Sequence, residues 1–167
     1  MEVFEAIKRR RSIREFRSDE VPKDYIEKII DAGRLAATAS NIQPWEFIVV
    51  NDNALKNDLY KIIKNNAPFL KDAPCAIVIV SKDVKHFVED CSAATQNMLI
   101  AATALGLGSC WIAGYLKEYE NDVKNLLNVP QNYRLVSIVV LGYTDVDPLK
   151  IKIKKRELKE VIHYNKF

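Results

Sequence analysis

A long stretch without any charged residue, Cys91 to Leu116, constrains the fold of this chain more than any other feature. The stretch exceeds the ~20 residues that a membrane-spanning helix needs. Polar side chains are scattered through its first half, however, and three glycines, Gly106, Gly108 and Gly114, interrupt its second half. Because glycine breaks regular structure, the stretch predicts a buried, alanine-rich helix over 93–105, then a turn and a buried strand. We therefore expect no membrane span.

Hydrophobic periodicity predicts helices and strands along the rest of the chain. Apolar residues recur at helical spacing in four further segments, at 3–7, 22–37, 55–63 and 123–127. Runs of β-branched residues predict three more strands, at 46–50, 73–80 and 135–142. Strands and helices do not alternate with a regular period, so the pattern favours an α+β fold or a mixed sheet with helices on both faces.

Length and charge limit the kind of molecule that this chain forms. With 167 residues, 49% of them apolar, it is long enough for one domain with a full core and too short for two, so we expect a single domain over residues 1–167. The net charge is +3, from 25 basic and 22 acidic residues, which is too small for the whole surface to bind nucleic acid. The basic residues gather at 8–17 and 150–159, so we expect a local anion site.

The cysteines and histidines favour neither disulfides nor a metal. Cys75, Cys91 and Cys110 are odd in number and widely spaced within apolar stretches, which predicts buried, reduced thiols. His86 and His163 have no partner at the spacing of metal ligands or of a catalytic triad, so we expect no metal site. The first residues lack the pattern of a signal peptide. Together these features favour a reducing, cytoplasmic location.

A dense arginine run, Arg9-Arg10-Arg11-Ser12-Ile13-Arg14, follows the first predicted helix. Planar guanidinium groups give paired, charge-assisted hydrogen bonds to phosphate, and a serine hydroxyl adds a donor. The run alone equally suits a solvated basic patch or a surface for nucleic acid. A second cluster, Lys154-Lys155-Arg156, has the same ambiguity. One phosphate bound between the two clusters explains both with a single ligand.

Two distant segments, 36–45 and 106–114, are small, apolar and amide-bearing, as the site of a planar polar ligand requires. Asn41 and Gln43 in the first segment also suit a cap or a turn after a helix. The second segment follows a helix and has Trp111 in place of a third glycine, so it is not the dinucleotide-binding motif. With the arginine run, the two segments suggest a flavin site.

The order of the motifs resembles the nitroreductase family of FMN-dependent oxidoreductases over nearly the whole chain. The matching motifs are Arg10-Arg11-Ser12-Ile13-Arg14, Asn41-Ile42-Gln43-Pro44-Trp45, Asp72-Ala73-Pro74, Gln96-Asn97, the segment Gly106 to Gly114, and Leu141-Gly142-Tyr143. The resemblance implies a mixed, mainly antiparallel central sheet flanked by helices, in an intertwined homodimer. It also implies that a C-terminal arm, about residues 146–167, packs on the partner subunit.

The resemblance further implies a cofactor, FMN, and its contacts. The residues that would hold its phosphate and ribityl chain are Arg10, Arg11, Ser12 and Arg14, with Lys154 and Arg156 from the tail. The residues along the isoalloxazine ring would be Asn66, Trp111, Ile112, Ala113 and Gly114, with Thr38, Asn41 and Gln43 from the second subunit. Ala113 and Gly114 would let the flat ring approach the backbone, whose N–H groups would bond a ring nitrogen. No side chain would act as a catalytic acid or base.

The implied reaction takes hydride from NADH or NADPH onto FMN and reduces a nitroaromatic, quinone or similar small acceptor by a ping-pong mechanism. Two alternatives stay open. One is a specialised flavin enzyme of the same family, such as a dehalogenase, a dehydrogenase or a flavin-destroying enzyme; the other is a non-enzymatic basic module that binds nucleic acid. The sequence departs from the family pattern at Ala37-Thr38, in the short segment 81–90, and at Phe69, where some members have a lysine near the ring.

Overall fold

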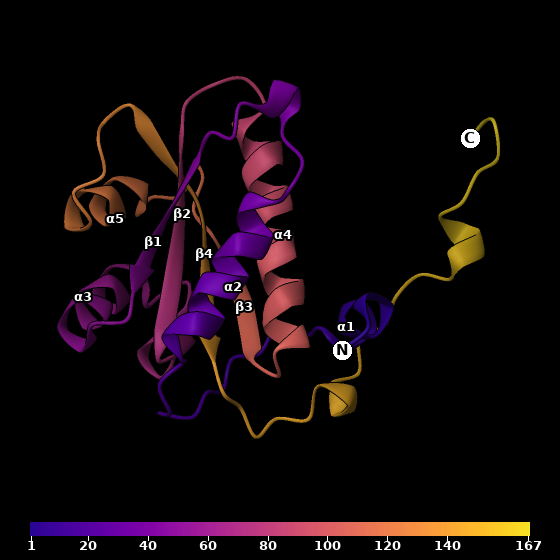
Figure 1. The fold of residues 1–167 in the computed structure, drawn as a ribbon, viewed down its shortest axis with the longest axis horizontal. Coiled ribbons are helices and arrows are strands. Elements are labelled where there is room, and N and C mark those ends of the chain that lie inside the picture. Colours follow the sequence, from indigo (N-terminus) through magenta and orange to yellow (C-terminus); the bar gives the residue numbers. More distant parts are fainter.

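The computed structural model describes all 167 residues and has a four-stranded sheet between two layers of helices (Figure 1). The strands are β1 (Trp45–Val50), β2 (Cys75–Lys82), β3 (Gly108–Ala113) and β4 (Tyr133–Gly142). They lie in the order β1-β2-β4-β3, and every neighbouring pair is antiparallel. One parallel bridge, between Ser12 and Ser109, makes the pairing mixed. The predicted α+β class, with a mixed and mainly antiparallel sheet, is confirmed.

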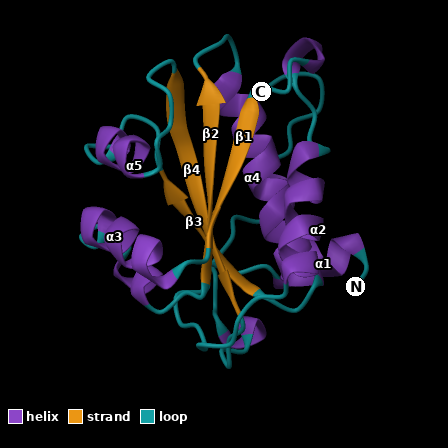
Figure 2. Ribbon diagram, turned by 60° about the vertical axis from the view of Figure 1, so that its left-hand side comes forward, coloured by secondary structure: helices purple, strands orange, loops and turns teal.

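Helices cover both faces of the sheet (Figure 2). One layer consists of α1 (Val3–Arg9), α2 (Lys23–Arg34) and α4 (Phe87–Ala104). The other consists of α3 (Asn53–Ile63) and α5 (Glu120–Leu126). The helices α2 and α4 pack closely at Gly33, where an added Cβ would lie 2.8 Å from Met98 Cγ. The sheet is therefore buried on both faces.

Two hydrophobic cores follow from the two faces of β2. Cys75, Ile77 and Ile79 belong to the core under α2 and α4, which has 17 buried residues. The residues between them point to the opposite face, and Ala76 and Val78 belong to the core under α3 and α5, which also has 17. Side chains alternate in this way along any strand. A strand buried on both faces explains why 73–80 is apolar throughout.

The charge-free stretch folds as predicted. The helix α4 ends at Ala104, Gly106 takes a left-handed φ of +81°, and β3 begins at Gly108. The helix starts at Phe87, earlier than the expected 93, because Phe87 packs into the core and because acidic residues in its first turn suit a helix N-terminus. None of the helices is both long and apolar enough to cross a membrane.

The end of α2 also differs from the sequence analysis. The helix α2 ends at Arg34 rather than near 37, because Leu35 leaves helical geometry with ψ near 2°. The last segment, 151–167, has no α-helix or strand and runs away from the body of the molecule (Figure 1). Nearly all of it is exposed, including the apolar residues Ile153, Leu158, Val161 and Ile162. This segment, 151–167, lies within the range predicted for an arm (about 146–167) and is hereafter called the C-terminal arm.

Candidate functional site

The arginine run is fixed to the edge strand of the sheet. Residues 10–14 are extended, and the N–H of Ile13 donates to the carbonyl oxygen of Ser109 at 2.9 Å. The Ile13 side chain is buried against Gly108, where an added Cβ would lie 2.8 Å from Ile13 Cγ2. Glycine at 108 therefore allows the run to approach β3 this closely.

Alternate side chains of the run face the start of β3. Burial raises the pKa of the Cys110 thiol. The positive charges of Arg14 and Arg10, and a hydrogen bond with Ser12, oppose that rise. These three residues occupy alternate positions of the run, and all three affect the Cys110 thiol of β3.

The guanidinium groups of this site have no acidic partner. No carboxylate lies within 4.0 Å of Arg10, Arg11 or Arg14, whereas Arg9 pairs with Glu5 at 2.9 Å and Arg17 with Asp19 at 2.8 Å. Guanidinium groups bind phosphate and carboxylate strongly through charge-assisted hydrogen bonds. The three arginines therefore make the run a candidate anion site, with Arg14 beside Phe69 and Arg11 on the side of Gly106.

Arg11 connects the run to the base of the C-terminal arm. Its Nε donates to the carbonyl oxygen of Ile151 at 3.2 Å, and its Nη1 donates to the carbonyls of Lys8 and Arg10. Lys154 follows shortly after this contact and is exposed without an ion pair. Arg156 is also exposed and pairs only with Glu160 of the arm itself. The structure thus brings the arm's base to the run and leaves the two basic side chains in solvent.

A turn after α3 lies beside the arginine run. The Arg14 guanidinium lies over the Phe69 ring, 5.6 Å from its centroid. Phe69 belongs to the short 3-10 helix Pro68–Lys71, and Asn66 is exposed just before that helix. A cation over an aromatic face is a favourable contact. Phe69 therefore holds Arg14 beside the Asn66 turn.

The free edge of β3 presents backbone groups next to this anion site. Within an antiparallel edge strand, alternate residues direct their N–H and C=O toward the neighbouring strand or away from it. Gly114 N–H points inward and donates to Val136 O at 3.0 Å, whereas the Ala113 carbonyl points outward and accepts from the Tyr119 hydroxyl. Ala113 and Trp111 therefore direct their N–H groups to the free edge, and Ala113 is exposed.

This geometry corrects one sequence-based expectation. The N–H of Gly114 is not available to a flavin, because Val136 accepts it. Glycine is required at 114 for packing instead, since an added Cβ would lie 2.5 Å from Leu135 Cγ. The Trp111 side chain packs against the core under α4, so the group that Trp111 presents at the free edge is its backbone N–H, as for Ala113. The Ile112 side chain is buried in the other core.

The loop Thr38–Gln43 lies away from the arginine run within one chain. Three of its residues have a left-handed backbone: Ser40 (φ 52°), Asn41 (φ 55°) and Gln43 (φ 50°). The Gln43 side chain donates to Asn41 Oδ1 at 3.0 Å, and Thr38 Oγ1 accepts from Gln43 N–H at 3.4 Å. Such backbone strain in several non-glycine residues is typical of functional loops.

The position of this loop is set by Asp90, in the first turns of α4. Its Oδ1 accepts from the Ala39 N–H at 3.1 Å. The arginine run lies near the other end of α4, where Arg9 and Arg11 line a cavity of about 220 Å³ with Gly106. The 18 residues of α4 span about 27 Å. A single chain therefore does not bring Thr38, Asn41 and Gln43 to the anion site.

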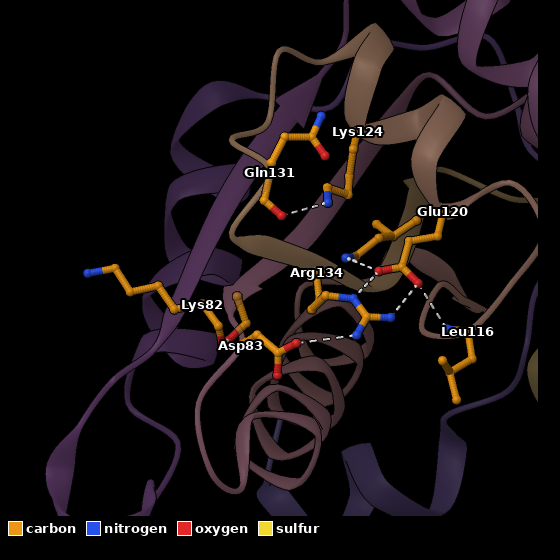
Figure 3. Close-up of polar contacts among 9 residues, drawn as sticks. Lys82, Asp83, Leu116, Glu120, Lys124, Gln131 and Arg134 are labelled. Carbon is orange, nitrogen blue, oxygen red and sulfur yellow. Dashed lines mark hydrogen bonds and ion pairs between the residues drawn. The ribbon is translucent and has the colours of Figure 1, made fainter.

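The sequence analysis did not single out several polar side chains around β3. Ser109 Oγ is buried and has no hydrogen-bond partner. Tyr119 and Glu120, at the start of α5, hold the turn that follows β3, and Arg134 of β4 pairs with Glu120 (Figure 3). A glutamate in the first turn of a helix is usually a surface residue, so the sequence offered no signal for this burial.

Comparisons with known proteins all lead to one family. The model of the "Nitroreductase family" matches residues 7–68 and 63–143. A Methanothermobacter thermautotrophicus protein, provisionally named an NADH dehydrogenase/NAD(P)H nitroreductase, is 38% identical over 154 residues, 89% of this chain and 80% of that protein.

Two solved structures have the same fold over almost the full chain. An FMN-dependent nitroreductase from Clostridium difficile R20291 is 33% identical with a TM-score of 0.84, covering 97% of this chain and 98% of that one. An iodotyrosine deiodinase bound to FMN and 3-iodo-L-tyrosine is 25% identical with a TM-score of 0.86, covering 99% and 100%.

Proposed function

This chain belongs to the nitroreductase family and is an oxidoreductase, and we propose that it uses FMN and NADH or NADPH to reduce a small acceptor such as a nitroaromatic or a quinone. The observation that carries the proposal is the arginine run: Arg10, Arg11 and Arg14 have no counter-charge, and the Ile13 N–H bonds the run to β3. When bound, FMN supplies the redox chemistry by accepting hydride and passing it on. The protein supplies binding, orientation and electrostatics.

The residues of the site fit FMN on several independent grounds. The arginine run suits a dianionic phosphate, with Ser12 as a further donor. Ser109 Oγ, buried and unpartnered, lies at the residue that bridges to Ser12 and is a ready partner for a polar ligand atom. The exposed Ala113 offers a backbone N–H at the free edge, without a large side chain to keep a flat ring away. We assign Asn66 and the segment 111–114 to the ring.

We extend the proposal to a homodimer in which each site is shared. The loop residues Thr38, Asn41 and Gln43 lie at the far end of α4 from their own arginine run, so a second copy of the chain would bring them to the ring. Exposed apolar residues of α1, among them Phe4 at 74%, leave a surface for that copy. The C-terminal arm, together with residues 146–150 before it, would pack on the partner and close Lys154 and Arg156 on the phosphate.

No side chain of the proposed site acts as a catalytic acid or base. The groups placed there are arginines, amides, hydroxyls and backbone N–H groups, and the Cys110 thiol is buried with a raised pKa. These groups bind and orient the cofactor and exclude bulk water from its phosphate. Sharing one flavin face between NAD(P)H and the acceptor gives ping-pong kinetics.

The test follows the visible spectrum of the purified protein. We expect a yellow protein whose absorbance bleaches when NADH or NADPH is added without oxygen and returns when a nitroaromatic or quinone is added. The response to the two nucleotides also decides which one is the donor. A protein that neither retains nor rebinds FMN would contradict the proposal.

A second candidate function is dehalogenation. It is favoured by the match to the iodotyrosine deiodinase structure, which extends over 99% of this chain. Only residues 83–86 connect β2 to α4, so no additional helix is inserted between these two elements. The test compares iodide release from 3-iodo-L-tyrosine by the reduced protein with its reduction of nitroaromatics. Iodide release without nitroaromatic reduction would favour the dehalogenase.

A further inference from the structure

The turn that follows β3 is held by a buried carboxylate. Glu120 is only 7% exposed, and both of its oxygens accept hydrogen bonds from the backbone. Its Oε2 accepts from the N–H of Leu116 at 3.1 Å, and its Oε1 accepts from the N–H of Leu135 at 3.3 Å (Figure 3). One side chain thus connects the turn after β3 to the neighbouring strand β4.

The backbone of this turn is strained at its most exposed position. Leu116 has a left-handed φ of 58°, and its side chain is 72% exposed. A branched residue in this conformation is strained and persists only where its surroundings hold it. The bond from Leu116 N–H to Glu120 is such a restraint, because no apolar packing fixes the Leu116 side chain.

Arg134 holds Glu120 and the turn at the same time. Its Nε and Nη2 donate to the two carboxylate oxygens of Glu120, at 2.6 and 3.0 Å. Its guanidinium also lies over the Tyr115 ring, 4.7 Å from the centroid. Tyr115 in turn meets the edge of the Phe87 ring at 5.2 Å. The side chain that follows Gly114 is therefore fixed between α4 and the ion pair.

The residue before Glu120 restrains the other end of the same turn. The Tyr119 hydroxyl donates to the carbonyl oxygen of Ala113. The N–H groups of Gly114 and Tyr115 both donate to Val136 O. From Ala113 to Leu116, the backbone is thus held by α5 on one side and by β4 on the other. The N–H of Ala113 is left facing the free edge.

We propose that Glu120, held by Arg134, is a positioning residue for the cofactor: it fixes the turn 113–116 and thereby the direction of the Ala113 N–H toward the flavin ring. The proposal rests on the proposed function, because it needs the flavin to lie along β3. A buried ion pair by itself is weak evidence for anything beyond fold stability. What argues for positioning here is that these contacts restrain the turn 113–116, which begins inside the segment 111–114 assigned to the ring.

The test compares three variants for FMN affinity, flavin midpoint potential and thermal unfolding of the apo protein. Glu120→Gln keeps the shape but loses the charge and one acceptor. Tyr119→Phe removes only the hydroxyl that bonds Ala113, so it provides a milder variant that keeps the core. The control is Val123→Ala, a fully buried position on the same helix; the substitution shortens an apolar side chain and keeps the backbone N–H that donates to Tyr119 O.

We expect Glu120→Gln to weaken FMN binding by about tenfold or more, the scale on which loss of an orienting partner acts at metal sites, and to shift the midpoint potential. Tyr119→Phe should change both in the same direction by less. Val123→Ala should lower the melting temperature and leave both flavin readouts at the wild-type values.

Two outcomes would overturn the proposal and are separable. If Glu120→Gln and Tyr119→Phe behave like Val123→Ala, losing thermal stability with unchanged affinity and potential, the ion pair only stabilises the fold. If the wild-type apo protein itself does not bind FMN, the proposed function fails and the positioning role fails with it.

Discussion

The main-chain N–H of Ile13 donates to the carbonyl oxygen of Ser109 at 2.9 Å, and this hydrogen bond joins the N-terminal arginine run to the edge of the sheet. The contact brings Ser12 alongside Ser109, whose buried hydroxyl has no partner within the chain. It also places the arginine run, whose Arg10, Arg11 and Arg14 have no counter-charge, beside a strand edge that has free backbone donors. The proposed anion site and the proposed ring site would thus be parts of one surface.

Arg14 is the arginine whose loss should affect the cofactor most directly. We expect Arg14→Ala to weaken FMN binding by roughly 10- to 100-fold, since a hydrogen bond to a charged group contributes about 1.5–3 kcal/mol. Arg17→Ala is the matched control, because Arg17 already pairs with Asp19 and Asp145. Fluorescence titration of apo protein with FMN measures both. Equal affinities in the two variants would place the phosphate elsewhere.

Crowding at Gly108 should separate flavin binding from general stability. In Gly108→Ala the new Cβ would lie 2.8 Å from Ile13 Cγ2 and push the arginine run from β3. Overpacking of this kind costs about 1–3 kcal/mol, and we expect weaker FMN binding as well. Gly33→Ala crowds Met98 Cγ at the same 2.8 Å but lies between α2 and α4. Gly33→Ala should lower the free energy of unfolding and leave the affinity for FMN unchanged. An equal loss of FMN affinity in the two variants would show that Gly108 has no specific role in the flavin site.

The helices and strands with strong hydrophobic periodicity were predictable from the sequence. The contacts that form the candidate site were predictable only in part. The stretch from Cys91 to Leu116 revealed its helix, turn and strand through composition and glycines alone. Glu120 and Arg134 come from different elements and have ordinary local patterns, so only the fold reveals their pairing. The left-handed backbone at Ser40 and Gln43 was invisible because neither residue is a glycine.

Gly114 shows how a correct motif can suggest the wrong role. The sequence places a glycine at the end of the segment that we propose lines the flavin, and a free N–H was the natural expectation. The hydrogen-bond pattern of β3 decides otherwise, because the N–H of Gly114 points to β4 and the N–H of Ala113 points to the open edge. The alternation of an edge strand is known only once its neighbour is known.

The cysteines should be inert while the protein is folded. Burial raises the pKa of Cys75 to about 12 and that of Cys91 to about 11. The free energy of unfolding should not depend on these thiols below about pH 8.5, the pKa of an unfolded thiol, and should fall as pH rises from there toward 11. Ellman's reagent at pH 8 should label neither Cys75 nor Cys91 until denaturant unfolds the chain. Rapid labelling of these two thiols in native buffer would contradict their burial.

Glu120 should contribute to acid unfolding. Burial opposes its charge, but hydrogen bonds from Arg134 and the Leu116 N–H outweigh burial and hold its pKa below the usual range. Its contribution is therefore complete above about pH 4.3, the pKa of an unfolded glutamate, and is lost as pH falls through the lower folded value. Denaturant unfolding at several pH values should show a weaker acid dependence in Glu120→Gln. An unchanged dependence would assign acid unfolding to other groups.

The C-terminal arm should control the oligomeric state. A chain ending at Lys150 lacks the exposed apolar residues of the arm and both of its basic candidates, Lys154 and Arg156. We expect this truncated chain to sediment as a monomer and to hold FMN less tightly, whereas the full chain should sediment as a dimer. Arg156→Ala in the full chain is the control, since it should weaken FMN binding without changing the number of subunits in the assembly. A truncated chain that remains a dimer and binds FMN with unchanged affinity would argue against the shared site.

The most direct test of the anion site is the affinity of wild-type apo protein for FMN compared with riboflavin, which has the same ring but no phosphate. Because Arg10, Arg11 and Arg14 have no counter-charge, we predict that FMN binds about 100-fold more tightly or better, and that added salt narrows the difference. Equal affinities for FMN and riboflavin would contradict the account, because the arginine run would then not hold the phosphate.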